Sequence, residues 1–455
     1  MLMCLPDELN IIIIDYVGYS TELLNGIWPD HVLINFYKEF EFDLNSLYLN
    51  FRLFKYVDKF RRLINVDDVC FVHGNLNTVS FRENFNEPLL LPKSLECVTF
   101  GHHFDQPIDL PEDLHSVTFG REFNQPVVFP NSLRELTWYS NRSIELPDSL
   151  HFIDFGSQFN QPVVLPNSLK TVQFGVQFNQ SVVLPENLRS VTFGDCFDQP
   201  VVLPENLHSV TFGNDFNQQV VLPENLHSVE FGYFFDQPVV LPDNLHSIAF
   251  DFCFNQSVIL SNGLRNIVFG DCFNQPVVLS NNLRDIVFGN CFNQPVVLPE
   301  NLQSVTFGWK FNQSVVLPSS LRSVIFGDDF NQSVVFPNRQ RDIIFGQSFN
   351  QPVVLPSSLR EIIFGNDFNQ PIVLPENLHS VRFGNSFDQP VVLPENLHSI
   401  IFGWDFNQPI LLPDSLHYVE FGWLFNQSVF LPDCLESLLY EYSRLRIEDN
   451  ELIPR

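Results

Sequence analysis

Residues 203–221, LPENLHSVTFGNDFNQQVV, form a repeating unit. Nearly all of the chain from residue 72 to residue 440 consists of variants of this unit. The aromatic residue at its tenth position, Phe212, recurs every 19 residues, except between Trp138 and Phe155, where the interval is 17. A fixed period of this size is typical of a solenoid, in which each unit buries its apolar face against its neighbours. The sequence therefore predicts one long array of about twenty rungs rather than several ordinary domains.

The unit, numbered from its first leucine, is apolar at positions 1, 5, 8, 10, 14 and 18. Leu207, Val210 and Phe212 have the spacing of a leucine-rich-repeat strand, in which alternate side chains enter the core. We expect one short parallel strand per rung, with the Gln-Pro-Val-Val-Leu arm on the opposite wall and no room for a full helix. We expect Gly213 and its counterparts to adopt a positive φ, and Asn217 and its counterparts at position 15 to bond the next rung's backbone.

Two rungs depart from the pattern. The 17-residue interval lacks the second core phenylalanine, and Trp138 stands in place of the first, so we expect the larger ring to fill the lost volume. Gln340 occupies a position where a core leucine is expected. The sequence predicts a weak point or a kink there.

Composition limits the classes of partner. A formal net charge of −29 argues against nucleic acid and anionic membranes, and favours a basic partner surface. The N-terminus lacks the features of a signal peptide, and no apolar stretch reaches the length of about 18 residues that a membrane span needs. The eight cysteines lack paired spacing, which predicts reduced thiols and a cytoplasmic protein. Cys253, Cys272 and Cys291 share one rung position; packing is the favoured interpretation and a metal site the alternative.

Residues 1–65 lack the repeat and have helical spacing of apolar residues, which predicts a small α-helical domain. The simplest role for such a domain is a cap on the open end of the array. Its opening run, LPDELNIIIIDYV, resembles the start of an F-box, and LYLNFRLFKYV resembles the third helix of that family. The resemblance implies docking to a Skp-family adaptor of a cullin-containing ubiquitin ligase. The residues that it assigns to adaptor binding are Leu5, Pro6, Leu9, Ile13, Phe51 and Phe54.

The Phe-Asn-Gln-Pro core of the rungs, as in residues 123–126 and 406–409, resembles the FNIP repeat, a short leucine-rich-like unit. Proteins with this repeat occur mainly in social amoebae and in giant viruses that infect amoebae, often with an F-box in front. The resemblance implies a leucine-rich-repeat-like solenoid that binds a target protein, in host cytoplasm if the source is viral.

Outward-facing positions are the candidates for target binding. Position 9 carries an aliphatic stripe, which reflects either strand propensity or a contact surface. Aromatic residues also occupy a loop position that is usually small or polar. The target-binding candidates are Ile325, Ile344, Ile363, Ile401, Trp309, Trp404, Trp423 and Tyr233. Position 6 is basic or histidine in nearly every rung, and we expect acidic residues at position 3 to neutralise it.

The sequence contains no catalytic constellation, phosphate loop or metal-ligand spacing, so we expect neither an enzyme nor a cofactor. The predicted organisation is an F-box-like domain over residues 1–65, a solenoid over residues 72–440 and a tail over residues 441–455. The predicted function is that of a substrate-recognition adaptor of an SCF-type ubiquitin ligase. The alternative is an interaction or structural rod with a helical end cap and no role in ubiquitination.

Overall fold

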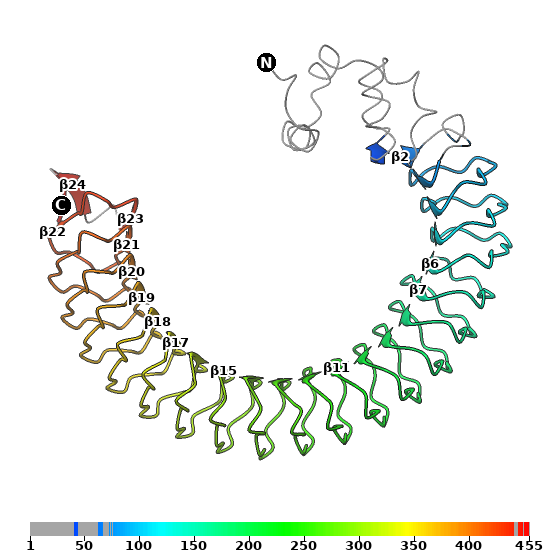
Figure 1. Cartoon of the computed structure of the whole chain (residues 1–455). Coiled ribbons are helices and arrows are strands. Elements are labelled where there is room, and N and C mark those ends of the chain that lie inside the picture. Colours follow the sequence, from blue (N-terminus) through cyan, green and yellow to red (C-terminus); the bar gives the residue numbers. More distant parts are fainter. Residues whose placement is uncertain are drawn as a thin grey trace, which may run out of the picture. The chain divides into compact units, whose positions relative to one another are not determined.

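The computed structural model describes residues 41–43, 62–66, 72, 74, 76–440, 445–448 and 450–454. The chain divides into two compact units, Met1–Phe197 and Asp198–Arg455, which are described separately. Figure 1 labels the strands along the chain.

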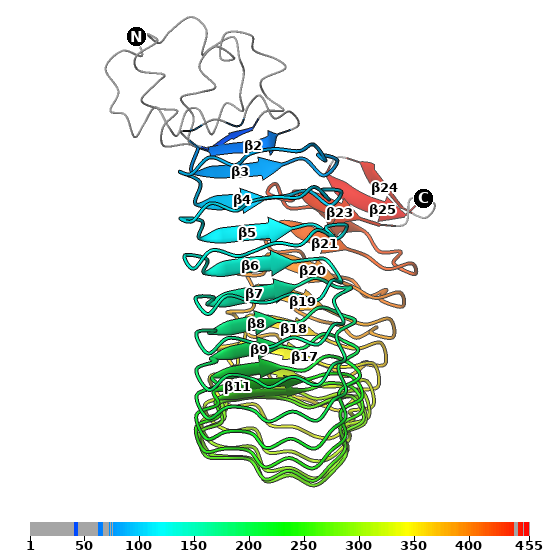
Figure 2. The same cartoon turned by 90° about the vertical axis from the view of Figure 1, so that its right-hand side faces the viewer.

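Parallel strands form the first unit, and Figure 2 shows β2 to β9 stacked edge to edge in one direction. They are β1 (Glu41–Asp43), β2 (Arg62–Val66), β3 (Thr78–Phe81), β4 (Cys97–Thr99), β5 (Ser116–Phe119), β6 (Glu135–Trp138), β7 (Phe152–Phe155), β8 (Thr171–Gln173) and β9 (Ser190–Thr192). Each strand pairs with the next strand along the chain. The β4 to β5 register, with Val98 opposite Val117, is one repeat long.

The second unit also has one short parallel strand per rung. Its parallel strands are β10 (Ser209–Thr211), β11 (Ser228–Phe231), β12 (Ser247–Phe250), β13 (Asn266–Val268), β14 (Asp285–Val287), β15 (Ser304–Thr306), β16 (Ser323–Ile325), β17 (Asp342–Ile344), β18 (Glu361–Ile363), β19 (Ser380–Arg382), β20 (Ser399–Ile401), β21 (Tyr418–Glu420) and β23 (Ser437–Leu439). Val210 lies opposite Val229, so every equivalent position forms a ladder along the unit. These strands confirm the predicted solenoid of short parallel strands with a 19-residue period.

Six apolar positions fill the interior of each rung, as the sequence predicts. In the unit at residues 203–221 all six side chains are at most 9% exposed. Phe212 and Phe216 stack on each other with ring centroids 4.0 Å apart. Each ring also stacks on its counterpart in the next rung, so two continuous phenylalanine ladders form the core.

The arm opposite the strands alternates between buried and exposed side chains. Val334 is 8% exposed whereas Val335, the next residue, is 86% exposed. This period of two confirms an extended arm. In residues 76–428, however, these arms are not hydrogen-bonded strands. The rungs are farther apart on this side: equivalent rings at position 10 are 5.8 Å apart for Phe307 and Phe326, but 6.1 Å apart at position 14 for Phe311 and Phe330.

The glycine at position 11 is required for a reason that the sequence did not predict. None of the turn glycines from Gly232 to Gly422 has the expected positive φ. Instead, the backbone of the preceding rung lies against it. A Cβ on Gly308 would lie 2.1 Å from the carbonyl oxygen of Gly289, which no side chain tolerates.

In the short rung, the tryptophan ring fills the volume left by the missing phenylalanine, as predicted. The indole of Trp138 is 1% exposed and meets the rings of Phe119 and Phe123 edge to face, at centroid distances of 5.4 and 5.7 Å. Its Nε1 donates a hydrogen bond to the carbonyl oxygen of Arg142 at 3.2 Å. One indole therefore contacts both phenylalanine ladders of the neighbouring rung and replaces two smaller rings.

Gln340 produces a weak point but no kink. Its side chain is fully buried, and its Nε2 donates to the carbonyl oxygen of Asp342 at 2.8 Å, while its Oε1 has no hydrogen-bond partner. The strands around it keep their register, with Ile343 opposite both Val324 and Ile362. The backbone turn is also preserved, because the amide of residue 340 donates to the Pro337 carbonyl oxygen as in other rungs.

The two ends differ from the predicted boundaries. Strand β1 lies within residues 1–65 and β2 crosses the end of that segment, so part of the segment predicted to be helical belongs to the sheet. The described residues contain no helix. At the other end, β24 (Leu445–Glu448) and β25 (Glu451–Pro454) form a hairpin that pairs with β22 (Val429–Phe430). The predicted tail is therefore folded onto the arm of the last rung. A search of the described residues for a membrane-spanning helix finds none.

Candidate protein-binding surface

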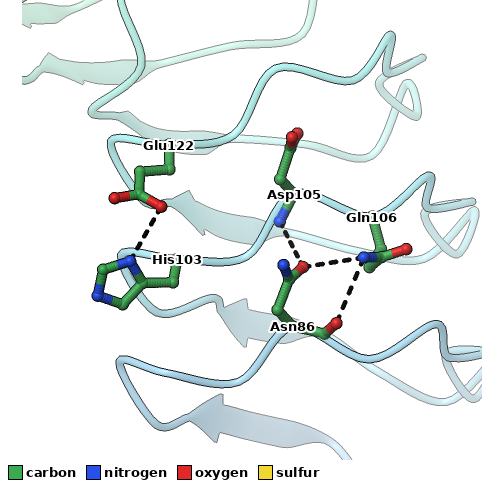
Figure 3. Close-up of polar contacts among 5 residues, drawn as sticks. All are labelled: Asn86, His103, Asp105, Gln106 and Glu122. Carbon is green, nitrogen blue, oxygen red and sulfur yellow. Dashed lines mark hydrogen bonds and ion pairs between the residues drawn. The ribbon is translucent and has the colours of Figure 1, made fainter.

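Position 15 fixes the geometry of most turns. In Figure 3 the Oδ1 of Asn86 accepts hydrogen bonds from the backbone amide of Asp105 at 2.9 Å and from the Nε2 of Gln106 at 3.1 Å. Asn160 repeats both contacts with the next rung, at 2.9 and 3.0 Å. The position-15 side chains are therefore structural, as predicted, and they hold the neighbouring turn residues at regular intervals.

The strand wall carries the predicted aliphatic stripe. Ile325 lies opposite Ile344, which in turn lies opposite Ile363, so these three predicted target-binding residues are brought side by side. Each is half-buried because the neighbouring rungs cover its flanks. The fourth residue, Ile401, is separated from them by Arg382.

The turn after each strand carries the predicted aromatic residues. We call positions 11 to 13 of the second unit, within residues 213–424, the turn edge. Trp309, Trp404 and Trp423 are 63%, 66% and 55% exposed, and Tyr233 is 37% exposed. The structure adds Phe234 and Phe252 to Tyr233, forming one contiguous cluster. The ring of Tyr233 lies 4.7 Å from Phe234 and 4.8 Å from Phe252.

The histidines at position 6 form two stacks. The rings of His208, His227 and His246 stack on one another at 5.1 and 5.3 Å, and a second stack is formed by His379, His398 and His417. The Nδ1 of His208 lies 2.8 Å from the carbonyl oxygen of Asn206, within its own turn. The ladder and the backbone contact orient these rings; neutralisation by the acidic residues of position 3 stays a prediction.

A third surface lies on the arm wall and was not predicted from the sequence. Position 19 is exposed and apolar in 13 successive rungs of the second unit, with exposed fractions between 70% and 90%. The members are Val202, Val221, Val240, Ile259, Val278, Val297, Val316, Val335, Val354, Val373, Val392, Leu411 and Phe430. The signal was present, because an arm with a buried position 18 must turn position 19 outward.

Two of the three aligned cysteines have thiols with a raised pKa. Burial raises the pKa of the Cys253 and Cys272 thiols, and neighbouring Asp236 adds to the effect in both cases. A raised pKa favours the neutral thiol over the thiolate that binds metals. Within the described residues, no group of three or more His, Cys, Asp or Glu side chains has the arrangement of a metal site.

The residues assigned to adaptor binding all lie outside the described residues. They are Leu5, Pro6, Leu9, Ile13, Phe51 and Phe54. Their role remains a prediction from the sequence.

Comparison with known proteins identifies the repeat. The family model of the FNIP repeat matches residues 104–138, 141–177, 159–196, 177–215, 197–234, 292–329, 330–367 and 387–424, which together exceed half of the chain. The crystal structure of CroV588, a circular leucine-rich-repeat protein, is similar at a TM-score of 0.62 and 29% identity, covering 88% of this chain and 75% of that one. YopM from Yersinia enterocolitica is similar at a TM-score of 0.55 and 17% identity, covering 84% and 86%; at that identity the likeness concerns the fold alone. None of the curated protein sequences matches the chain.

Proposed function

The chain belongs to the FNIP repeat family, and we propose that it is a non-enzymatic recognition subunit of an SCF-type ubiquitin ligase. The solenoid holds a target protein, and the N-terminal segment docks a Skp-family adaptor and its cullin. A repeat solenoid of this kind is a protein-interaction fold, because stacked rungs offer an extended surface and build no unique catalytic cleft.

The observation that carries the target-binding half of the proposal is the exposure of six aromatic side chains on the turn edge. They are Tyr233, Phe234, Phe252, Trp309, Trp404 and Trp423, each between 37% and 66% exposed. Other rungs place small or polar residues at these positions, such as Asn366 and Ser386, so the repeat does not require rings there. Exposed aromatic side chains are typical anchors of protein interfaces.

The adaptor half rests on the sequence resemblance of residues 1–65 to an F-box. It is tested by titrating the full-length protein with a purified Skp-family adaptor in a calorimeter. We expect binding by the native chain, and loss of binding by a Pro6→Ala, Leu9→Asp double variant. A Val335→Asp variant, changed on the exposed arm wall, serves as the matched control and should bind normally.

The alternative is an interaction rod without a link to ubiquitination. Absence of adaptor binding by the native chain would favour it, and would leave the target-binding half of the proposal standing. Equal binding by the native chain and the double variant would instead remove Pro6 and Leu9 from the contact.

A further inference from the structure

We propose that the turn edge of the second unit binds an extended basic segment of a partner protein, with arginine or lysine side chains lying on the exposed rings between aspartate carboxylates. This inference rests on the proposed function of the solenoid in protein binding, and it names the chemistry of the partner. Four features of the edge lead to it: rigidity, exposed rings, charge and the spacing of the rings.

Backbone hydrogen bonds make the turn edge rigid. The amide of Cys253 donates to the carbonyl oxygen of Tyr233 at 2.9 Å, and the amide of Asp329 donates to that of Trp309 at 2.8 Å. The same bond joins Leu424 to Trp404 at 2.9 Å. Side chains on neighbouring turns are consequently held within contact distance, so little conformational entropy is lost when a ligand binds.

The rings of the turn edge are exposed to solvent. Tyr233 and Phe252 are parallel within 2° at a centroid distance of 4.8 Å, and Phe234 meets Tyr233 at 74°. Burial in the core does not account for them, because Phe234 is 49% exposed and Trp309 is 63% exposed. Aromatic faces at a surface attract guanidinium and ammonium groups through the ring quadrupole.

The negative charge of the turn edge favours a positively charged ligand. Five exposed aspartates lie among the rings: Asp215, Asp251, Asp329, Asp367 and Asp405. In the turns at residues 213–424, the only basic side chain is Lys310. A carboxylate beside an aromatic ring stabilises a cation on that ring and repels phosphate, so nucleic acid does not fit this edge. A second copy of the chain, with its net charge of −29, is also disfavoured.

The spacing of the rings indicates an extended ligand. Trp309 lies three rungs beyond Phe252, and Trp404 lies five rungs beyond Trp309. At about 5 Å per rung these intervals are roughly 15 and 25 Å, which an extended chain crosses in about 5 and about 8 residues. A segment of about 20 residues therefore reaches from the Tyr233 cluster to the tryptophans at the end of the unit.

The inference is tested by fluorescence anisotropy with the full-length protein and a labelled 20-residue peptide of four Arg-Gly-Ser-Gly-Ser repeats, at about 150 mM salt to screen distant charges. A peptide with citrulline in place of arginine keeps the shape and loses the charge. The test variant combines Tyr233→Ser, Phe252→Ser, Trp309→Ser and Trp404→Ser, which leave the net charge unchanged. The matched control combines Val240→Ser, Val278→Ser, Val316→Ser and Val354→Ser on the arm wall.

We expect the arginine peptide to bind the native chain and the control variant equally, and the citrulline peptide to bind neither. The aromatic variant should bind roughly tenfold more weakly, since each exposed cation–π contact contributes modestly. Equal affinity of the aromatic variant, or no binding of the arginine peptide to the native chain, would overturn the inference. Adaptor binding measured on the same preparations reports separately on the proposed function, because none of these substitutions lies within residues 1–65.

Discussion

The two walls of each rung carry the same kind of side chain and expose it differently. Ile344 on the strand wall is half-buried, whereas Val335 on the arm wall is 86% exposed. The strand wall is hydrogen-bonded from rung to rung, which keeps neighbouring side chains about 4.8 Å apart and lets them cover one another. The ring spacing widens to 6.1 Å at position 14, toward the arm, where no strands form before residue 429 in the described array. The strand wall and the core therefore contribute most of the stability. The outward side chains of the arm wall contribute little and are exposed to solvent.

The largest contrast is between core and arm. We expect Phe311→Ala to destabilise the second unit by about 3–5 kcal/mol, because its ring is fully buried and stacks on Phe307 at 3.9 Å. Val316→Ala, at a side chain that is 85% exposed, should change stability by less than about 0.5 kcal/mol. Urea unfolding followed by circular dichroism measures both. Equal effects would show that the arm is packed.

Gln340 offers a gain in stability on the core side. Gln340→Leu restores the residue found at this position in neighbouring rungs and removes a buried oxygen that has no hydrogen-bond partner. We expect stabilisation of about 1–3 kcal/mol, measured as a shift of the urea midpoint. The control is Gln303→Leu, at an exposed position directly before β15, which should shift the midpoint little. A loss of stability in Gln340→Leu would mean that the bond to the Asp342 carbonyl is worth more than apolar packing.

The two aliphatic surfaces can be compared directly. A triple variant of Ile325→Thr, Ile344→Thr and Ile363→Thr removes cross-strand apolar contacts, and should destabilise the protein by about 1–2 kcal/mol in total. A matched triple variant of Val316→Thr, Val335→Thr and Val354→Thr keeps the β-branched shape on the arm wall and should be neutral. Thermal unfolding of the two proteins side by side measures the difference. Equal melting temperatures would contradict the distinction between the walls.

The smallest expected effect concerns acidic residues on the two walls. Burial on the strand wall raises the pKa of Asp154 above its ordinary value of 3.8. The folded state therefore holds the proton more tightly than the unfolded state, and stability falls as pH rises through that interval. Asp154→Asn should stabilise the protein slightly at pH 7, with the gain disappearing below about pH 4. Glu145→Gln, at the exposed arm position 19, should have no effect at either pH. Thermal melts at the two pH values provide the measurement.

The sequence predicted the parts of the fold that the repeat itself encodes. Position 10, occupied by Phe212, recurs at a fixed period, and periodicity alone places it in a ladder. The turn glycine was predicted, but for the wrong reason. The observed reason is the close approach of the preceding rung's backbone, seen at Gly308, which depends on how the rungs stack in three dimensions. The paired strands β1 and β2 were not predicted, since their sequences do not carry the repeat.

The candidate surfaces were predicted unevenly for a related reason. Trp309 was identified because it breaks the pattern of its position, and its exposure confirms the expectation. The exposed position-19 surface of the arm wall, which includes Val335, was overlooked because nearly every rung has an apolar residue at that position. Phe252 was overlooked as well, because its partner Tyr233 lies 19 residues earlier and only the stacked fold brings the two rings together.

Hydrogen–deuterium exchange of the full-length protein tests the distinction between the two walls most directly. We expect backbone amides of the strand wall, such as those of Val305 and Val324, to exchange slowly because they lie in paired strands. Amides of the arm, such as those of Val315 and Val316 in the same rung, should exchange many times faster. Equal protection of strand and arm amides within one rung would contradict the account, because it would require a second hydrogen-bonded wall.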